Sequence, residues 1–152
     1  MRITIYGTRY NLFREVEIVK ERAINYSDSV SKMDSPERVV ELMQQIFDIG
    51  NLCEEHVYLV VLDAGRRTRG IFDVSHGILN SSLVHPREIF TRALLCGSAN
   101  SIIILHNHPS GMLDISEDDR AVSSRIRQAG EILGIHLDDH LIIAGDSFVT
   151  AM

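Results

Sequence analysis

The residues best suited to chemistry lie in one short segment of the chain. His106 and His108 are one residue apart, so in extended backbone both imidazoles point to the same side. They follow the apolar segment 101–105, which predicts a buried strand. Asp119 falls in the first turn of a predicted helix and can bring a carboxylate back to the same point. Two imidazoles and one carboxylate, with a fourth position free, are typical of a catalytic zinc site.

The cysteines argue against a structural zinc site. Structural zinc is usually closed by four protein ligands, most of them cysteines. This chain has only Cys53 and Cys96, and their separation forms no metal-binding pair. Two reduced thiols are typical of a cytoplasmic protein. We therefore expect one catalytic zinc ion per chain and a cytoplasmic location.

A zinc hydrolase also needs a base that takes a proton from water and a donor that stabilises the oxyanion. Glu54 and Glu55 enter a predicted strand, and strand alternation puts one carboxylate on each side. The periodicity alone does not say which of them faces the metal, and both fit a solvated strand end. Ser116 is the predicted N-cap of the third helix, a role that needs no catalytic function. Beside a metal, its hydroxyl could cap the helix, donate to the oxyanion, or do both.

The remaining histidines and one asparagine are weaker candidates. His136 and His140 have a spacing that suits metal binding on a helix, but they lie in a predicted strand. We expect them to pack in the core or to hydrogen-bond behind the metal ligands. His56 should face the opposite side of its strand from its neighbour Glu55. Asn107 should point away from the metal and bond a turn. The other two, His76 and His85, are expected in loops.

Capping and periodicity signals predict the elements that position these residues. A helix should begin at Ser35-Pro36 and end near Gly50, a second should run from Pro86 to Gly97, and a third from Glu117 to Gly134. Strands are predicted at 56–63, 68–75, 101–105, 141–144 and 147–149, the last two joined as a hairpin around Gly145-Asp146. The first 30 residues predict two short strands with a polar connection, and segment 26–31 a linker or mobile loop. The sum is an α/β domain with a mixed sheet and flanking helices.

Length and charge bound the function class. The 152 residues suit a single domain, and the net charge of −6 provides no general basic surface for nucleic acid. The N-terminal residues lack the apolar segment of a signal peptide. No apolar run approaches the roughly 20 residues that cross a bilayer. We expect neither secretion nor membrane insertion, and the sequence does not specify the oligomeric state.

The motifs together resemble those of a RadC-type member of the JAMM metallopeptidase (MPN-domain) superfamily. That family pattern is an upstream glutamate, then His-x-His-Pro, then Ser-x-x-Asp. In this chain the three parts are Glu55, residues 106–109 and residues 116–119. The RadC-type form adds Pro-Arg-Glu-Ile-Phe and Asp-His-Leu-Ile, found here at 86–90 and 139–142.

The resemblance divides the chain into residues 1–33, with N-terminal strands and a linker, and residues 34–152, a RadC-like JAMM/MPN domain. We expect the chain to lack the helix-hairpin-helix region that precedes this domain in full-length RadC proteins. The implied fold is the MPN fold, a mixed, curved β-sheet with flanking helices. The implied site has zinc on His106, His108 and Asp119, with Glu55 acting through the water at the fourth position and Ser116 supporting the oxyanion.

Three functions are consistent with this pattern. The first is a zinc-dependent hydrolase that cuts a peptide or isopeptide bond in a protein or peptide substrate. The second is a role associated with DNA repair or mobile elements, which the acidic net charge does not support. The third is a non-catalytic MPN interaction module, against which the complete ligand set argues.

Overall fold

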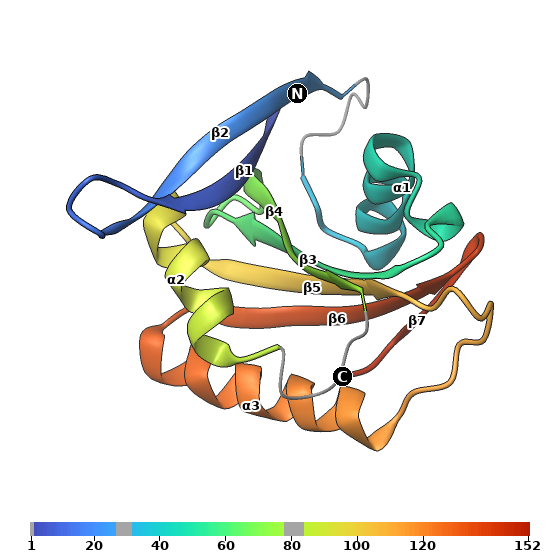
Figure 1. Ribbon diagram of the computed structural model, residues 1–152. Coiled ribbons are helices and arrows are strands. Elements are labelled where there is room, and N and C mark those ends of the chain that lie inside the picture. Colours follow the sequence, from blue (N-terminus) through green and yellow to red (C-terminus); the bar gives the residue numbers. More distant parts are fainter. Residues whose placement is uncertain (1, 27–31, 78–83) are drawn as a thin grey trace.

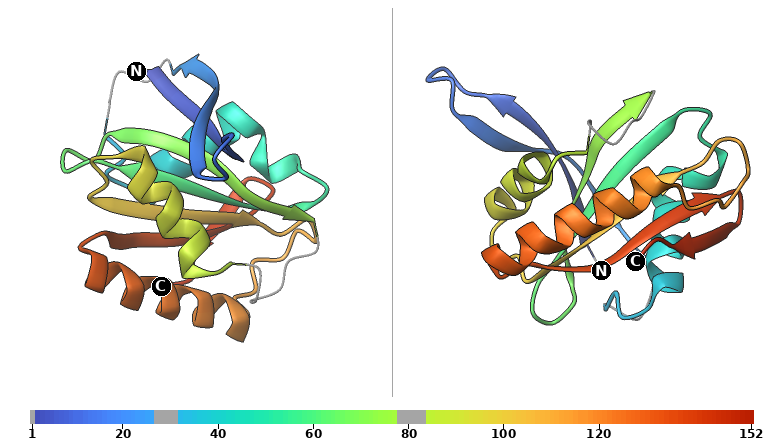
Figure 2. Two further views of the ribbon diagram at one scale, coloured as in Figure 1. Left: turned by 60° about the vertical axis from the view of Figure 1, so that its left-hand side comes forward. Right: turned by 90° about the horizontal axis from the view of Figure 1, so that it is seen from below.

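The computed structural model describes residues 2–26, 32–77 and 84–152. Within these ranges the chain forms one mixed, curved sheet of seven strands with three α-helices on its two faces (Figures 1 and 2). The predicted α/β architecture is therefore confirmed. The linker predicted at 26–31 lies, apart from its first residue, outside the described residues.

The sheet has the strand order β2-β1-β4-β3-β5-β6-β7. Two neighbouring pairs, β1 with β4 and β5 with β6, are parallel, and the other pairs are antiparallel. The strands are β1 (Arg2–Tyr10), β2 (Val16–Asn25), β3 (Glu55–Leu62), β4 (Thr68–Gly77), β5 (Ser101–Asn107), β6 (His136–Ala144) and β7 (Ser147–Thr150). All of β5 and most of β3 are buried, as their continuous apolar runs predict.

The helices begin where the sequence predicts. They are α1 (Pro36–Phe47), α2 (Pro86–Cys96) and α3 (Glu117–Leu133). Ser35 caps α1 and Ser116 caps α3 through their side chains. The first helix ends earlier than the predicted Gly50, because Asp48 adopts a left-handed φ of 51° and a short 3₁₀ turn, Ile49–Asn51, follows. Among the described helices, none combines the length and the apolar character needed to cross a bilayer.

Helices cover both faces of the sheet, and a hydrophobic core fills each side. Alternate residues of β3 serve the two cores: Tyr58 and Val60 face α1, whereas Leu59 and Val61 face α2 and α3. The α1 side is closed by Val39, Leu42, Met43, Ile49, Leu105 and Leu141. The other side is closed by Phe72, Ile89, Phe90, Ile104, Val122 and Ile126. This double cover holds the ends of β3 and β5 in fixed positions.

The N-terminal strands differ from the prediction. They span nine and ten residues rather than forming two short strands, and they project from the body of the sheet as a hairpin (Figure 1). Only β1 joins the rest of the sheet, by parallel pairing of Ile5 with Ile71 and Tyr6 with Phe72. In the two strands themselves only Ile3 and Ile5 are buried, so the hairpin has little of the apolar alternation from which strands are predicted.

The strand β4 also extends two residues further than predicted. His76 therefore lies in the strand, directly opposite His56, and not in a loop. The reason is a β-bulge: Ser75 and Asp73 face consecutive residues of β3, which leaves Val74 as an extra residue between them. The extra residue interrupts the period-2 pattern that marks a strand in the sequence.

Candidate metal centre

The five residues singled out in the sequence border one cavity. The cavity has a volume of about 250 Å³, and its walls come from β3, β5, β6, α3 and the segments before α2 and α3. Its polar lining consists of Glu55, His106, His108, Ser116, Asp118, Asp119 and His140. Its apolar lining consists of Val57, Val84, Ile104 and Val122. The fold thus brings together groups that lie more than sixty positions apart in the chain.

Three potential ligand atoms converge in this cavity, and we call their residues, His106, His108 and Asp119, the cavity cluster. The Nε2 atom of His106 lies 3.0 Å from Nε2 of His108 and 3.3 Å from Oδ1 of Asp119. Two ligands on one tetrahedral zinc ion, with bonds of about 2.0–2.1 Å, are separated by about 3.3 Å. The three atoms therefore have the spacing of ligands that share a single ion.

A chain of hydrogen bonds lies behind His106 and suits the tautomer that a metal ligand needs. The Nδ1 atom of His106 lies 2.9 Å from Nε2 of His140, and Nδ1 of His140 lies 2.7 Å from the Ser123 hydroxyl. That hydroxyl can donate to the Ala151 carbonyl at 2.9 Å, which can only accept. With the hydroxyl donating to that carbonyl, Ser123 accepts from His140, and His140 in turn accepts from Nδ1–H of His106. The lone pair of His106 Nε2 is left facing the cavity.

The neutral state of His140 supports this chain. Burial lowers the pKa of His140 to about 3. A neutral imidazole offers one donor and one acceptor, as the chain requires. For His136 and His140 the sequence predicts core packing or a hydrogen bond behind the ligands. His140 is buried and bonds His106, as predicted, whereas His136 is exposed, which differs from the prediction.

A second hydrogen bond fixes His108 in the same way. Its Nδ1 atom lies 2.9 Å from the carbonyl oxygen of Met112, which can only accept a proton. The hydrogen therefore stands on Nδ1, and the lone pair of Nε2 faces the lone pair of His106 at 3.0 Å. Two lone pairs this close repel each other unless a cation lies between them. The donor set thus fits a metal ion of the class that imidazole and carboxylate bind.

The start of α3 holds the third ligand. The Ser116 hydroxyl accepts a hydrogen bond from the Asp119 amide at 3.0 Å, and Oδ2 of Asp119 accepts from the Ser116 amide at 2.9 Å. This capping box leaves Oδ1 directed at His106. Burial raises the pKa of Asp119, but the nearby His106 ring and the hydrogen bonds with Ser116 outweigh it and hold the pKa below its usual range. The group is therefore an ionised carboxylate, as a metal ligand must be.

The structure distinguishes Glu54 from Glu55, which strand periodicity alone did not, by the direction in which each side chain points. Glu55 is half-buried and lines the cavity, whereas Glu54 is exposed to solvent. Asn107, only 2% exposed, fixes this facing: its Oδ1 accepts from the His56 amide at 2.7 Å and its Nδ2 donates to the Glu54 carbonyl at 2.9 Å. Asn107 points away from the cavity as predicted, but it ties down the start of a neighbouring strand rather than a turn.

Sequence reasoning missed two of the supporting groups. Ser123 lies four residues after Asp119, so both face the same side of α3, and this spacing was the available signal. The Met112 carbonyl belongs to an irregular loop, and no residue type marks a backbone oxygen in advance. These two groups orient the side chains that line the cavity but do not line it themselves.

Comparison with known proteins adds an independent finding. The family model described as "RadC-like JAB domain" matches residues 33–152. The UPF0758 protein of Clostridium beijerinckii is 43% identical over 119 residues, which cover 78% of this chain and 51% of that protein. The UPF0758 protein of Clostridium novyi is 40% identical over 134 residues, which cover 88% of this chain and 58% of that protein. The chain spans about half the length of these curated relatives.

Proposed function

Because this chain belongs to the RadC-like JAB domain family, we propose that it is a zinc-dependent hydrolase that cuts a peptide or isopeptide bond in a protein substrate. One observation carries the proposal. In the cavity cluster, the two Nε2 atoms and one carboxylate oxygen lie at ligand spacing, and both histidines have hydrogen-bond partners behind them. A half-buried carboxylate, Glu55, borders the same cavity.

The cavity cluster would hold the ion through Nε2 of His106, Nε2 of His108 and Oδ1 of Asp119. When bound, zinc supplies a Lewis acid that polarises the scissile carbonyl and makes water acidic near neutral pH. We expect one such ion per chain in this cavity.

Glu55 is the residue we assign to proton transfer. Its carboxylate would take a proton from the attacking water and then deliver that proton to the nitrogen of the leaving amine. The amide carbon–nitrogen bond breaks in the second step, so the products are a carboxylate and an amine. Asn107 contributes indirectly, because its hydrogen bonds to the His56 amide and the Glu54 carbonyl hold the backbone on both sides of Glu55.

Ser116 is the residue we assign to the oxyanion. In the capping box its oxygen accepts a hydrogen bond from the Asp119 amide, so the hydroxyl hydrogen is not consumed by capping. The same side chain can therefore cap α3 and donate to a developing oxyanion at the same time. The apolar wall formed by Val57, Val84, Ile104 and Val122 would receive an aliphatic part of the substrate.

The decisive experiment is the substitution Glu55→Gln. Glutamine preserves the size of the side chain but cannot accept the proton, so hydrolysis should be abolished while the zinc content and the melting temperature stay unchanged. The measurement is the set of proteins cleaved in a lysate of the source cells, compared between the wild type and Glu55→Gln. Glu54→Gln is the matched control and should cleave like the wild type. If Glu54→Gln is the inactive variant instead, the assignment of the base is wrong.

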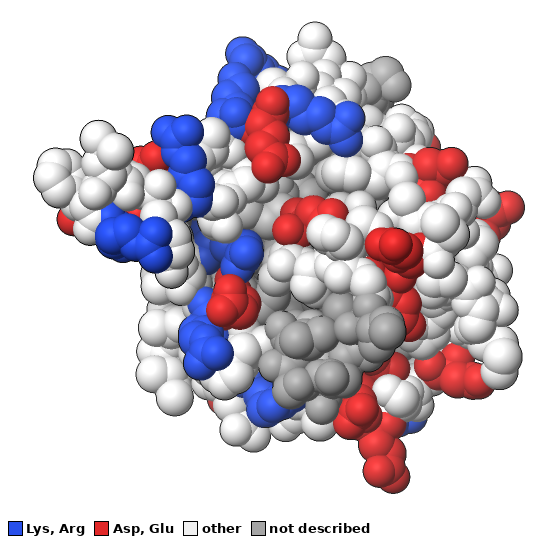
Figure 3. All heavy atoms as spheres, in the orientation of Figure 1, with Lys and Arg blue, Asp and Glu red and all other residues white. Residues whose placement is uncertain are grey.

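DNA association is the second candidate. Figure 3 shows Lys and Arg side chains gathered over the β1–β2 hairpin and α2, and a groove there is lined by Arg9, Arg87 and Arg92. However, Arg9 bonds Glu17 at 2.6 Å and Arg92 bonds Glu88 at 3.2 Å, so DNA phosphates would have to displace carboxylates. We expect only weak binding of duplex DNA. Submicromolar affinity at about 150 mM salt, tighter than typical non-specific binding, would contradict this ranking.

A further inference from the structure

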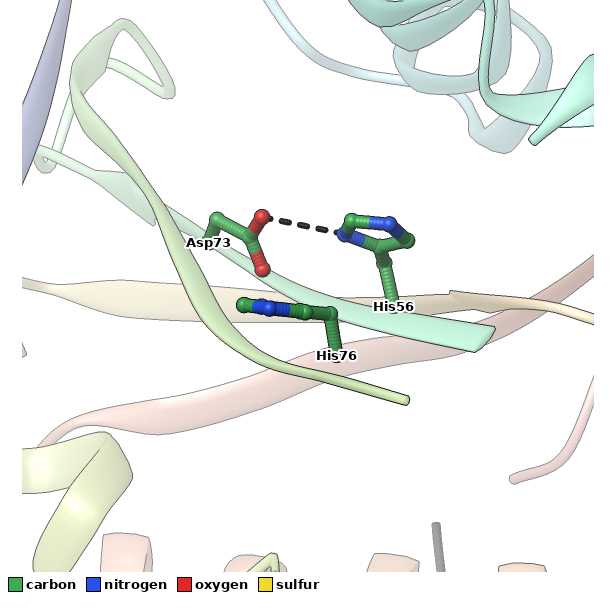
Figure 4. A group of neighbouring side chains, drawn as sticks. All are labelled: His56, Asp73 and His76. Carbon is green, nitrogen blue, oxygen red and sulfur yellow. Dashed lines mark hydrogen bonds and ion pairs between the residues drawn. The ribbon is translucent and has the colours of Figure 1, made fainter. Parts of the chain in front are cut away.

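A second group of potential metal ligands lies on the other side of the same sheet. We call its residues, His56, Asp73 and His76, the surface cluster. One nitrogen of each ring and one oxygen of the carboxylate all lie within 4.8 Å of one another. Figure 4 shows that the three side chains come from β3 and β4 and converge on one side of this strand pair, with the His76 ring reaching toward Asp73. None of them borders the cavity.

The β-bulge in β4 creates this convergence. His56 and His76 are direct cross-strand partners, so their side chains stand side by side, with ring centroids 5.4 Å apart. Asp73 lies three positions before His76, and in a regular strand it would face the opposite side. The extra residue Val74 restores Asp73 to the side of the two histidines. The carboxylate then reaches Nδ1 of His56 at 3.0 Å.

We propose that the surface cluster is a second binding site for a divalent transition-metal ion of the zinc class, distinct from the cavity cluster. Two imidazoles and one carboxylate are ligands that zinc, nickel and copper accept. The remaining coordination positions would be filled by water, because Asp73 and His76 are exposed and His56 is partly exposed.

A simple hydrogen bond between His56 and Asp73 accounts for only part of the arrangement. It explains the contact at 3.0 Å, but it does not need the second imidazole. His76 is exposed and yet stacks on His56 with an interplanar angle of 23°, which keeps its ring beside the pair. A metal ion uses all three groups, because it replaces the shared proton and binds both rings.

The two clusters are separated by the backbone of one strand. Glu55 faces the cavity and its neighbour His56 faces the surface cluster. The His56 amide in turn donates a hydrogen bond to Asn107, the residue between His106 and His108 in the sequence. A test must therefore distinguish the two sites by stoichiometry and not by activity.

The test is the zinc content of the full chain after dialysis against micromolar zinc, measured by elemental analysis. The wild type should retain two ions per chain. Asp73→Asn and His76→Gln should each retain one, and so should the double variant His106→Ala/His108→Ala. The matched control His136→Gln removes an exposed histidine that belongs to neither cluster, and it should retain two ions. Both surface substitutions are at exposed positions, so the fold should be unaffected.

Two outcomes would overturn the proposal. One is a wild-type chain that retains a single ion, which the double cavity variant then loses. The other is a second ion that Asp73→Asn and His76→Gln leave in place. As a second measurement, nitrogen-15 spectra of the histidine rings should show the His56 and His76 signals shift on the second equivalent of zinc, while His136 does not. An inactive wild type with two ions would contradict the proposed hydrolase and leave the surface cluster supported.

Discussion

The cavity cluster and the surface cluster contain the same ligand types but differ in what stands behind them. Each has two histidines and one aspartate with ligand atoms within 4.8 Å of one another. In the cavity cluster, every ligand has a hydrogen bond on its far side: His140 holds His106, the Met112 carbonyl holds His108, and the α3 capping box holds Asp119. In the surface cluster, the hydrogen bond between His56 and Asp73 joins two ligands to each other.

The difference shows that a fold can bring three ligand side chains together more simply than it can hold each of them in one orientation. A cross-strand pair and one bulge are enough to bring three ligands together on a surface. Fixing a tautomer takes a partner with the right donor or acceptor, itself fixed by a further partner. Such outer partners typically contribute 10–100-fold to metal affinity. We therefore expect the cavity cluster to bind zinc more tightly than the surface cluster.

The largest effect should come from removing a ligand of the cavity cluster. His106→Ala deletes the central nitrogen, which lies near both other ligand atoms, so the zinc that survives gel filtration should be lost. The measurement is zinc per chain by elemental analysis, and His136→Ala is the control that should keep this zinc. Full retention of gel-filtered zinc in His106→Ala would show that the tighter site is elsewhere.

The next effect concerns the helix start that holds Asp119. Ser116→Ala removes both the cap and the proposed oxyanion donor, so turnover should fall on the order of 100-fold or more with zinc retained. Loss of the cap should also reduce the free energy of unfolding by about 0.5–2 kcal/mol.

Ser35→Ala provides the matched control for that substitution, because Ser35 caps the remote helix α1 in the same way. It should lower the melting temperature to a similar extent and leave turnover unchanged. If both variants lose stability and neither loses turnover, Ser116 acts as a cap alone.

A smaller effect should follow from weakening the support behind a ligand. Ser123→Ala removes the acceptor for Nδ1–H of His140, which in turn orients His106. We expect the zinc affinity of the cavity cluster to fall 10–100-fold, measured by competition with a chelator. Ser124→Ala changes the exposed neighbour on the same helix and should have no effect. Equal affinity in both variants would mean that the hydrogen-bond chain does not contribute to metal binding.

Signals that act over a few residues were predictable from the sequence. Ser35-Pro36 and Ser116 with Asp119 mark helix starts by local capping, and both helices begin there. The spacing of His106 and His108 predicts their shared direction for the same reason, since strand geometry alternates with a period of two.

Features that depend on pairing between strands were not predictable. The bulge at Val74 exists only relative to β3, so the sequence of β4 alone places His76 in a loop. Strand periodicity alone did not choose between Glu54 and Glu55, and only the family resemblance favoured Glu55. The facing depends on hydrogen bonds of Asn107, more than fifty positions away. The N-terminal hairpin buries too few residues to leave an apolar pattern, so its strand lengths were underestimated.

The order of the strands also determines how copies of this chain behave when they meet. An open sheet ends in two strands whose outer backbone groups can pair with a neighbouring molecule. Here one end is β7, which has only four residues, and the other is β2, whose middle carries the exposed charges of Lys20, Glu21 and Arg22. An incoming strand would meet either too short a template or a row of charges. The molecule is thereby protected against edge-to-edge aggregation, the route by which flat, uncharged sheets grow into fibres.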